Sequence, residues 1–457
     1  MIPASMTFED AIREVGFGRF QIKLLVLCGL GWAADAMEVL LIAFVIPAVG
    51  KEWNLNASQL GLLGTAIFLG MLLGALVWGR VSDLIGRKIG FLSTIAIDSV
   101  FGLLSAFSPS FAWLIILRTL TGFGVGGTLP VDYSIFAEYL PPQKRGRYLV
   151  LLEAFWALGA VAAAGLAWLI VPRLGWRWLL AVSALPGIII VFIRREIPES
   201  PRYLLVSGKP EQAREVLAKV AAANGRVLPN RPLQPIQSTV QARATDLLKQ
   251  NLRLTTLLLW LIWFALSLGY YGTFTWLPRF LGAKVGTLNV YQNAFILALA
   301  QLPGYFSAAY LVEKIGRKRT LALYLFGSGV FTYLFAAADS LHWLVFMGIW
   351  MSFFTLGAWG ATYAYTPEAY PTSLRATGMG AASAWARIAG AIAPSLGAAL
   401  SSGRFDLVVP LTVFAVAFMI GGLAALGLPH ETANLPLADS VSAIGSKGTG
   451  ADARQAG

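Results

Sequence analysis

The sequence predicts an all-α membrane protein with twelve transmembrane helices in two six-helix halves and both termini in the cytoplasm. Three observations lead to this fold class. The 457 residues are 57% hydrophobic and only 13% charged, whereas soluble proteins average about 45–50% apolar and about 25% charged residues. Apolar runs of about 20 residues, long enough to cross a ~30 Å hydrocarbon core, recur along the chain. Two charged motifs also return at one constant offset.

The apolar runs form two groups of six, separated by a polar stretch. The first group lies near residues 20–49, 59–79, 89–107, 113–136, 148–171 and 176–193. The second group lies near residues 254–281, 291–312, 320–338, 342–366, 376–400 and 408–428. Strands of a membrane barrel need only about 10 residues of alternating pattern, so these runs indicate helices. The first run is too long for a signal peptide, and Asp35 and Glu38 interrupt it.

These runs define the predicted domain organisation. An N-terminal six-helix half covers residues 1–193, a cytoplasmic linker loop 194–253, a C-terminal six-helix half 254–428 and a cytoplasmic tail 429–457. Within the linker, residues 210–222 begin with proline and place Ala, Val and Leu at helical spacing, which predicts a short surface helix. The tail is rich in Ser, Gly and Ala, which is typical of disorder.

The charge and cysteine content exclude several classes of protein. The net charge is +12, but 27 of the 35 Lys and Arg residues lie on segments that are cytoplasmic when both termini are inside. This asymmetry follows the positive-inside rule and gives no sign of a nucleic-acid partner. The single cysteine, Cys28, excludes a disulfide scaffold, a multi-cysteine zinc site and an iron–sulfur cluster. Two histidines, His342 and His430, argue against a histidine-based metal site.

An internal repeat relates the two halves. The sequence DLIGRK at Asp83–Lys88 returns as EKIGRK at Glu313–Lys318, an offset of 313 minus 83, or 230 residues. The residues Glu138, Pro141 and Arg145 return as Glu368, Pro371 and Arg375 at the same offset. Two motifs with a shared offset imply two halves in the same orientation, related by an axis along the membrane normal.

Three segments carry a resemblance to a known family. The stretch GRVSDLIGRK at Gly79–Lys88 and its second-half copy resemble the loop-2–3 signature of the major facilitator superfamily. The segment PESPRYL at Pro198–Leu204 resembles the sugar-porter and organic-ion branch. The segment ADAMEVLLIAFVIP at Ala34–Pro47 is similar to synaptic-vesicle-related transporters and to bacterial niacin and aromatic-acid transporters. The resemblance covers residues ~15–430.

The resemblance implies a gate made of charged residues at the cytoplasmic corners. Asp83 and Arg87 would form a clasp with helix eleven and with the loop between helices four and five, which would hold an outward-open state. Glu138 with Arg145, and Glu368 with Arg375, would form matching pairs. The alternative is that these charges only record topology. The expected gating residues are Asp83, Gly86, Arg87, Lys88, Glu138, Arg145, Glu313, Gly316, Arg317, Glu368 and Arg375.

Ionisable groups inside spans are costly and indicate function. At about 1.5 Å per residue, Asp35 and Arg118 both lie roughly 22 Å from the cytoplasmic edge, so we expect them to meet. Sugar-porter relatives pair an acid of helix one with an arginine of helix four for proton coupling, and the resemblance maps these residues onto Asp35 and Arg118. Glu38 shares a helix face with Asp35. The expected proton-coupling residues are therefore Asp35, Glu38 and Arg118; the alternative is a permanently ionised pair in a uniporter.

Arg387 lies roughly 17 Å into the eleventh run, near the midplane where transporter substrates bind. A guanidinium at this depth favours a carboxylate substrate, and anion transporters of the organic-ion branch carry an arginine in helix eleven. The alternative is that Arg387 pairs with an acid such as Asp98 or Asp35. The other expected substrate-binding residues are aromatic or amide side chains: Tyr270, Tyr271, Trp276, Asn293, Gln301, Trp359 and Tyr363. The competing explanation for the aromatic residues is packing or interfacial belts.

Other motifs have more local interpretations. The segment GYYGTFTWLP at 269–278 predicts an interrupted helix where a gate bends. The glycines Gly122, Gly124, Gly126 and Gly127 predict close helix contact and no dinucleotide site, because no strand precedes them. No Walker A pattern is present, which argues against ATP as the energy source. We expect Asp132 and Glu153 to pair with Arg145 or Arg147, and Asp98 has no assigned role.

The function predicted from these features is secondary active transport, not enzymatic catalysis. We expect proton-coupled import of a small organic anion, such as nicotinate or a similar aromatic monocarboxylate, by alternating access. The expected transporter uses the proton gradient, needs no cofactor or metal, and is a monomer in the lipid bilayer of a bacterial inner membrane with no nucleic-acid partner. A sugar/proton symporter, an organic-cation or drug transporter, and a non-transporting membrane receptor or structural vesicle protein are the alternatives.

Overall fold

The computed structural model of the protein describes residues 5–141, 148–149, 151–185, 187, 197–234, 244–285, 290–371, 374–401 and 408–432. Within these ranges the regular structure is helical, and the one β feature is an isolated parallel bridge between Met6 and Leu233. The chain divides into two units. Unit 1 contains residues 1–239 and 275–298, and unit 2 contains residues 240–274 and 299–457.

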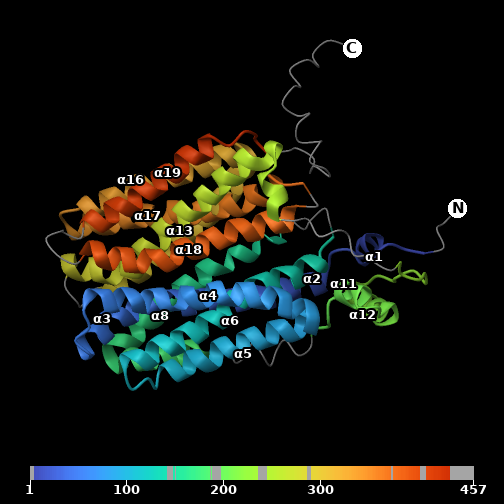
Figure 1. The fold of residues 1–457 in the computed structure, drawn as a ribbon, viewed down its shortest axis with the longest axis horizontal. Helices are drawn as coiled ribbons and strands as arrows, with labels where there is room; N and C mark the ends of the chain where they lie inside the picture. Colours follow the sequence, from blue (N-terminus) through green and yellow to red (C-terminus); the bar gives the residue numbers. More distant parts are fainter. Residues whose placement is uncertain are drawn as a thin grey trace, which may run out of the picture. The chain divides into compact units, whose positions relative to one another are not determined.

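Unit 1 contains the first set of long apolar helices. They are α2 (Arg19–Leu40), α3 (Ile42–Glu52), α4 (Ala57–Ile85), α5 (Arg87–Ser105), α6 (Phe111–Glu138), α8 (Phe155–Leu174), α9 (Trp176–Ser183) and α14 (Val290–Leu299). The helices α4, α5 and α6 lie side by side (Figure 1). Three short helices belong to the same unit: α1 (Phe8–Val15), α11 (Pro201–Val206) and α12 (Pro210–Ala223).

Unit 2 contains the second set. Its elements are the 3-10 helix η2 (Ala244–Leu248), most of α13 (Gln250–Val285), α15 (Gln301–Lys314), α16 (Arg317–Ala337), α17 (Leu341–Glu368), α18 (Arg375–Ser401) and α19 (Val408–Leu426). The helix α16 packs between α17 and α19 (Figure 1).

Ten helices of the described chain are long and apolar enough to cross a membrane. The helix α18 covers the predicted eleventh span, and the predicted sixth span is described only at residues 176–185 and 187. The all-helical membrane fold is therefore confirmed, whereas the number twelve and the side on which the termini lie stay predictions. The predicted tail lies outside the described residues from 433 onward.

Two spans are interrupted at a single residue, although each continues as one span. The first is interrupted at Leu41, between α2, which ends at Leu40, and α3, which begins at Ile42, and Leu41 itself keeps a right-handed helical backbone. The eighth stops at Leu299 and resumes at Gln301. Pro303 explains this second break, because a proline ring collides with the carbonyl group four residues earlier, which here belongs to Leu299.

The segment at 269–278 corrects a prediction. The helix α13 runs unbroken from Gln250 to Val285 and carries Pro278 inside it. Its glycines serve packing: a Cβ on Gly269 would lie 2.5 Å from the Phe418 ring, and a Cβ on Gly272 would lie 2.3 Å from the Phe414 ring. Both rings belong to α19. The two glycines therefore allow α19 to pack closely against α13, and they do not interrupt α13.

The predicted surface helix at 210–222 is confirmed as α12, with proline in its first turn. It packs together with α1, which the sequence analysis did not predict, in one hydrophobic cluster. Asn224, directly after α12, joins this cluster to α2. Its side-chain amide donates to Gln21 Oε1 at 2.9 Å, and its oxygen accepts from the Phe20 amide at 3.1 Å. These hydrogen bonds connect the end of α12 to the start of α2, and the two helices can be located in Figure 1.

The predicted close contact at the glycines of α6 is confirmed. A Cβ on Gly122 would lie 2.0 Å from the Ile67 carbonyl oxygen, and a Cβ on Gly126 would lie 2.2 Å from that of Met71. Both oxygens belong to α4. Gly124 lies close to the backbone of α5, where an added Cβ would be 2.6 Å from the Asp98 amide nitrogen. In lipid, where apolar surface gains little by leaving the solvent, such close backbone approach is the main source of helix association.

We expect Gly122→Ala to destabilise unit 1, because the neighbouring atoms are backbone and cannot move aside. Overpacking of this kind costs about 1–3 kcal/mol, which should lower the apparent melting temperature of the purified protein in detergent. The control is Gly79→Ala on α4, where no atom lies within 4 Å of the added carbon. Equal melting temperatures for the two variants would contradict the close-contact interpretation.

Candidate functional site

Four ionisable side chains are buried together in unit 1. Asp35 and Glu38 are on α2, Asp98 is on α5 and Arg118 is on α6, and none is more than 2% exposed. All four lie within predicted spans. Burying a single charge is strongly unfavourable unless it is paired, so their mutual arrangement decides what the group can do.

Arg118 forms its ion pair with Glu38, one helical turn beyond the Asp35 that the sequence predicted. Arg118 Nη1 lies 2.8 Å from Glu38 Oε2, and Nη2 donates to the Glu38 backbone carbonyl at 2.6 Å. The other carboxylate oxygen of Glu38 accepts from Ser183 Oγ on α9 at 2.8 Å. The backbone contact has a structural reason: Glu38 is in the last turn of α2, where carbonyl groups lose their intrahelical partners.

Asp98 completes this group from the side of α5. A Cβ on Gly102, one turn from Asp98, would lie 3.3 Å from Glu38 Oε1. The Glu38 carboxylate therefore rests against the face of α5 that carries Asp98. Asp98 interacts electrostatically with Glu38, Asp35 and Arg118. The structure thus brings together all three predicted proton-coupling residues and adds the acid to which the sequence assigned no role.

Glu153 is buried between α2 and α6. Its carboxylate accepts from the Trp32 indole at 3.2 Å and from the Tyr133 hydroxyl. The predicted pairing of Glu153 with Arg145 or Arg147 involves groups outside the described residues and stays a prediction. The predicted pairing of Asp132 likewise stays a prediction.

Unit 2 gathers several of the predicted substrate residues into one aromatic cluster. The ring centroids of Tyr270 on α13 and Trp359 on α17 lie 6.2 Å apart. Trp359 also contacts Tyr363 of α17. Trp263 lies at the centre, 5.7 Å from Trp359 and 5.0 Å from Tyr363. Tyr271 contacts Tyr270 at 5.1 Å. The sequence analysis missed Trp263, although it lies two helical turns before Tyr270 on the same face.

Arg387 lies on α18 and is buried, with 8% of its surface exposed. The carbonyl of the preceding residue, Ala386, accepts from Ser267 Oγ at 2.6 Å. Ser267 lies on α13 between Trp263 and Tyr270, so this bond places Arg387 at the level of the aromatic cluster. A guanidinium can bind the charged group of an anion, and aromatic rings at the same level can stack on its planar part. This combination favours a flat anion.

The remaining predicted substrate residues are dispersed. Trp276 belongs to unit 1 and stacks with Arg279 at 5.4 Å. Asn293, on α14 of unit 1, and Gln301, on α15 of unit 2, are both buried. No described residue hydrogen-bonds to Asn293 Nδ2 or Gln301 Oε1. Their roles in binding stay predictions.

The repeat at an offset of 230 residues is visible as two equivalent helix starts. Gly86 and Gly316 precede α5 and α16 with φ angles of 100° and 99°. This region of φ favours glycine. A carboxylate also occupies the space of the missing side chain: a Cβ would lie 2.4 Å from Glu199 at Gly86 and 2.4 Å from Glu431 at Gly316.

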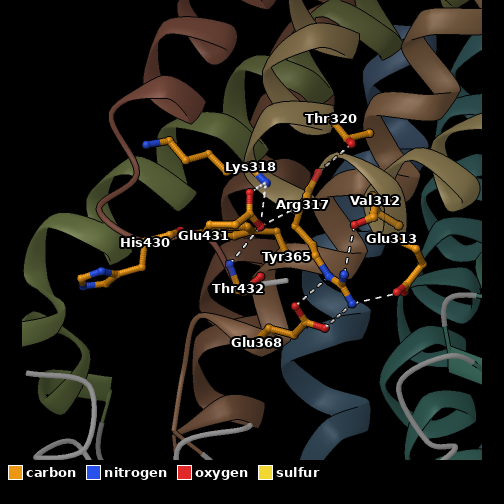
Figure 2. Close-up of polar contacts among 11 residues, drawn as sticks. Val312, Glu313, Arg317, Lys318, Thr320, Tyr365, Glu368, His430, Glu431 and Thr432 are labelled. Atoms are coloured by element: carbon orange, nitrogen blue, oxygen red, sulfur yellow. Dashed lines mark hydrogen bonds and ion pairs between the residues drawn. The ribbon is translucent and has the colours of Figure 1, made fainter. Parts of the chain in front are cut away.

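Each carboxylate caps the helix that follows the glycine. Glu199 Oε1 accepts from the backbone amides of Arg87 at 2.9 Å and Lys88 at 3.1 Å. In Figure 2, Glu431 accepts in the same way from Arg317 at 2.8 Å and Lys318 at 3.2 Å. Negative charge at a helix N-terminus is favourable because the helix dipole is positive there. The sequence analysis quoted the segment around Glu199 without assigning the residue a role, and it missed Glu431.

The charged corner of unit 2 is built around Arg317. Arg317 Nε lies 3.1 Å from Glu368 Oε2, and Nη2 lies 3.2 Å from Glu313 (Figure 2). Arg375 Nε donates to the Pro367 carbonyl at 2.8 Å. Arg317, the first residue of α16, is therefore a partner of Glu368 that the sequence analysis did not predict, and the predicted pairing of Glu368 with Arg375 stays a prediction.

The matching corner of unit 1 is described in part. Glu138 accepts from Ser200 Oγ, and it interacts electrostatically with Arg87. Arg87 Nη1 donates to Ser82 Oγ at 3.1 Å. The predicted pair between Glu138 and Arg145, and the clasp that uses the Asp83 side chain, involve groups outside the described residues and stay predictions.

We expect Glu38→Gln to destabilise the protein strongly. The substitution removes the direct ion pair of the buried Arg118 guanidinium, and breaking a buried pair in this way costs about 3–5 kcal/mol. Thermal unfolding of the purified variant should begin at a clearly lower temperature. Ser183→Ala is the control, because it removes only a neutral hydrogen bond to the same carboxylate. A smaller loss for Glu38→Gln than for Ser183→Ala would contradict the pairing.

Comparison with known proteins gives the chain its family. The sequence matches the family described as "Sugar (and other) transporter" over residues 34–439. The niacin transporter NiaP of Acinetobacter baylyi is 38% identical over 392 residues, which cover 85% of this chain and 89% of the relative. Organic cation/carnitine transporter 7 of Arabidopsis thaliana is 35% identical, with 96% and 97% covered. The synaptic vesicle 2-related protein of Xenopus laevis is also 35% identical, with 96% and 84% covered.

Solved structures share the fold. The partially occluded inward open conformation of the xylose transporter XylE from E. coli matches with a TM-score of 0.75 at 16% identity, covering 92% of this chain and all of that chain. At that identity the likeness concerns the fold alone. Together with the family match, it shows that this chain belongs to the sugar (and other) transporter family of the major facilitator superfamily, and is a multi-pass membrane transporter and not an enzyme.

Proposed function

We propose that this transporter imports a small organic anion, nicotinate or a similar aromatic monocarboxylate, together with protons. The observation that carries the substrate class is the position of Arg387 at the level of the cluster of Trp263, Tyr270 and Trp359. The guanidinium supplies a charge-assisted contact for a carboxylate, and the rings supply stacking surface for a planar ring. The similarity to a niacin transporter supports the same substrate class.

The proposed coupling ion is the proton, and the proposed coupling site is the acidic group around Arg118. Buried carboxylates that share one guanidinium respond to protonation because each charge alters the free energy of the others. In this proposal the proton gradient is the energy source, and no cofactor or metal takes part. The two units would exchange access to the site by alternating access, as a monomer in a bacterial inner membrane.

Two other substrates have specific support. The Arabidopsis relative is named an organic cation/carnitine transporter, and an aromatic cluster can also bind a cation through the faces of its rings. The buried charge of Arg387 opposes a cation at that level. A sugar is the second alternative, because the family includes sugar transporters, but a sugar would be bound better by amides than by a guanidinium.

We expect Arg387→Ala to weaken nicotinate binding about 10–100-fold, since a hydrogen bond to a charged group contributes about 1.5–3 kcal/mol. Arg387→Lys keeps the charge but loses the bidentate geometry, so it should fall between the native protein and the alanine variant. Isothermal titration of purified protein with nicotinate and with its neutral amide, nicotinamide, measures both effects.

The amide provides the internal control for this experiment. Nicotinamide should bind the native protein more weakly than nicotinate and should lose little further affinity in Arg387→Ala. Arg319→Ala, on the exposed side of α16, should leave both affinities unchanged. If nicotinate and nicotinamide bind the native protein equally, the anion proposal fails and a neutral substrate replaces it.

A further inference from the structure

The acidic group of unit 1 contains more negative than positive charge. Among the described residues, the charged groups that interact with Asp98 are Asp35 and Glu38 from α2 and Arg118 from α6. The helices α4 and α9, which also pack against α5, contribute no charged group to it in the described part of the chain. Three carboxyl groups therefore share one guanidinium in a region that is 98% or more buried.

The hydrogen bonds show which carboxyl group already has its counter-charge. Glu38 binds Arg118 with Oε2 and with its backbone carbonyl, and its Oε1 accepts from Ser183. Glu38 therefore has a counter-charge, and both of its carboxylate oxygens are satisfied. A second full negative charge close to this pair would have no counter-charge of its own, which a low-dielectric interior strongly disfavours.

Two carboxyl groups of this set have an oxygen that accepts no hydrogen bond from a described residue: Oδ1 of Asp98 and Oδ2 of Asp35. Asp35 makes a further interaction, so Asp98 is the less completely bonded of the two, although it is only 2% exposed. An unmatched donor lies in the same group: Arg118 Nε has no acceptor among the described residues. The group thus contains, in Asp98, an acceptor that can take up a proton and, in Arg118, a nitrogen that can bind an additional acceptor.

We propose that Asp98 is the residue that binds and releases the coupled proton; this inference rests on the proton coupling proposed above. In the arrangement seen here, Asp98 is neutral and Arg118 is neutralised by Glu38. In the step itself, hydronium transfers one proton to Asp98 Oδ1 and leaves as water, and the reverse reaction on the opposite side returns the proton. No electron is transferred and no further reactant is needed.

The same geometry explains how release is triggered. When Arg118 moves away from Glu38 toward α5, its free Nε–H can stabilise an ionised Asp98, so the proton leaves. When the Arg118–Glu38 pair forms again, the ionised Asp98 loses that stabilisation and takes up a proton. The proton on Asp98 is therefore linked to the position of a single guanidinium between α2 and α5.

Infrared difference spectroscopy tests the protonation directly, without transport. The native protein should show the C=O stretching band of a protonated carboxyl group that disappears in Asp98→Asn. Ser99→Ala, a buried neighbour on α5, should keep the band. Asp98→Glu should shift the band without abolishing it, which guards against failure of the asparagine variant to fold. A carboxyl band that loses no intensity in Asp98→Asn compared with Ser99→Ala, or a native protein without any such band, would overturn the proposal.

Transport then separates this proposal from the proposed function. Nicotinate exchange by native protein in liposomes should change by up to about tenfold per pH unit, as expected for one proton. In Asp98→Asn, exchange should persist and become nearly independent of pH, while Ser99→Ala stays pH-dependent. Unchanged pH dependence in Asp98→Asn would overturn the role of Asp98. A native protein with the infrared band but no pH dependence would support a protonated Asp98 and refute proton coupling.

Discussion

The buried ion pair between Arg118 and Glu38 is the interaction on which the organisation of unit 1 depends. A guanidinium without solvent exposure needs a negative partner nearby, and α2 supplies it at the turn where that helix breaks. The carbonyl of Glu38 gives the arginine a second contact. This arrangement holds α2 against α6 and, through Ser183, against α9. It also leaves Asp98 to share the same guanidinium electrostatically with Glu38.

The two copies of the repeated motif show how residues distant in the chain stabilise the same local backbone conformation. Gly86 and Gly316 adopt the same unusual backbone conformation, and each receives a carboxylate from a segment more than one hundred residues later. The glycine is needed twice, because a side chain would strain the backbone and would collide with the carboxylate. Each corner therefore contains a helix cap, and the corner of unit 2 also contains the Arg317–Glu368 ion pair.

Composition and periodicity were sufficient to predict the membrane class, the helical fold and the surface helix α12. They were sufficient because apolar run length, proline position and the repeat are local properties of the sequence. Depth along a helix also placed Arg118 near the acids of the first span. It did not distinguish Asp35 from Glu38, because three residues differ by only about 4.5 Å in height and the break at Leu41 shifts the end of the helix.

The contacts that could not be predicted are those between distant segments. Nothing in the local pattern around Glu431 indicates that it caps α16 more than one hundred residues earlier, and nothing around Glu368 indicates that Arg317 is its partner. Trp263 is one of many tryptophans in an apolar run, and only the packing of α17 reveals its central place. The small helix α1 did have a local signal, since Phe8, Ala11, Ile12 and Val15 lie on one face.

The central claim is that buried acids in unit 1 couple the movement of a carboxylate to that of protons. The most direct measurement records nicotinate uptake and internal pH together in liposomes that contain the purified native protein and start without any gradient except nicotinate. The account predicts that nicotinate entry acidifies the interior at a fixed ratio of protons to nicotinate, and that nicotinate accumulates when a proton gradient alone is imposed. Nicotinate entry with no accompanying proton movement would contradict it.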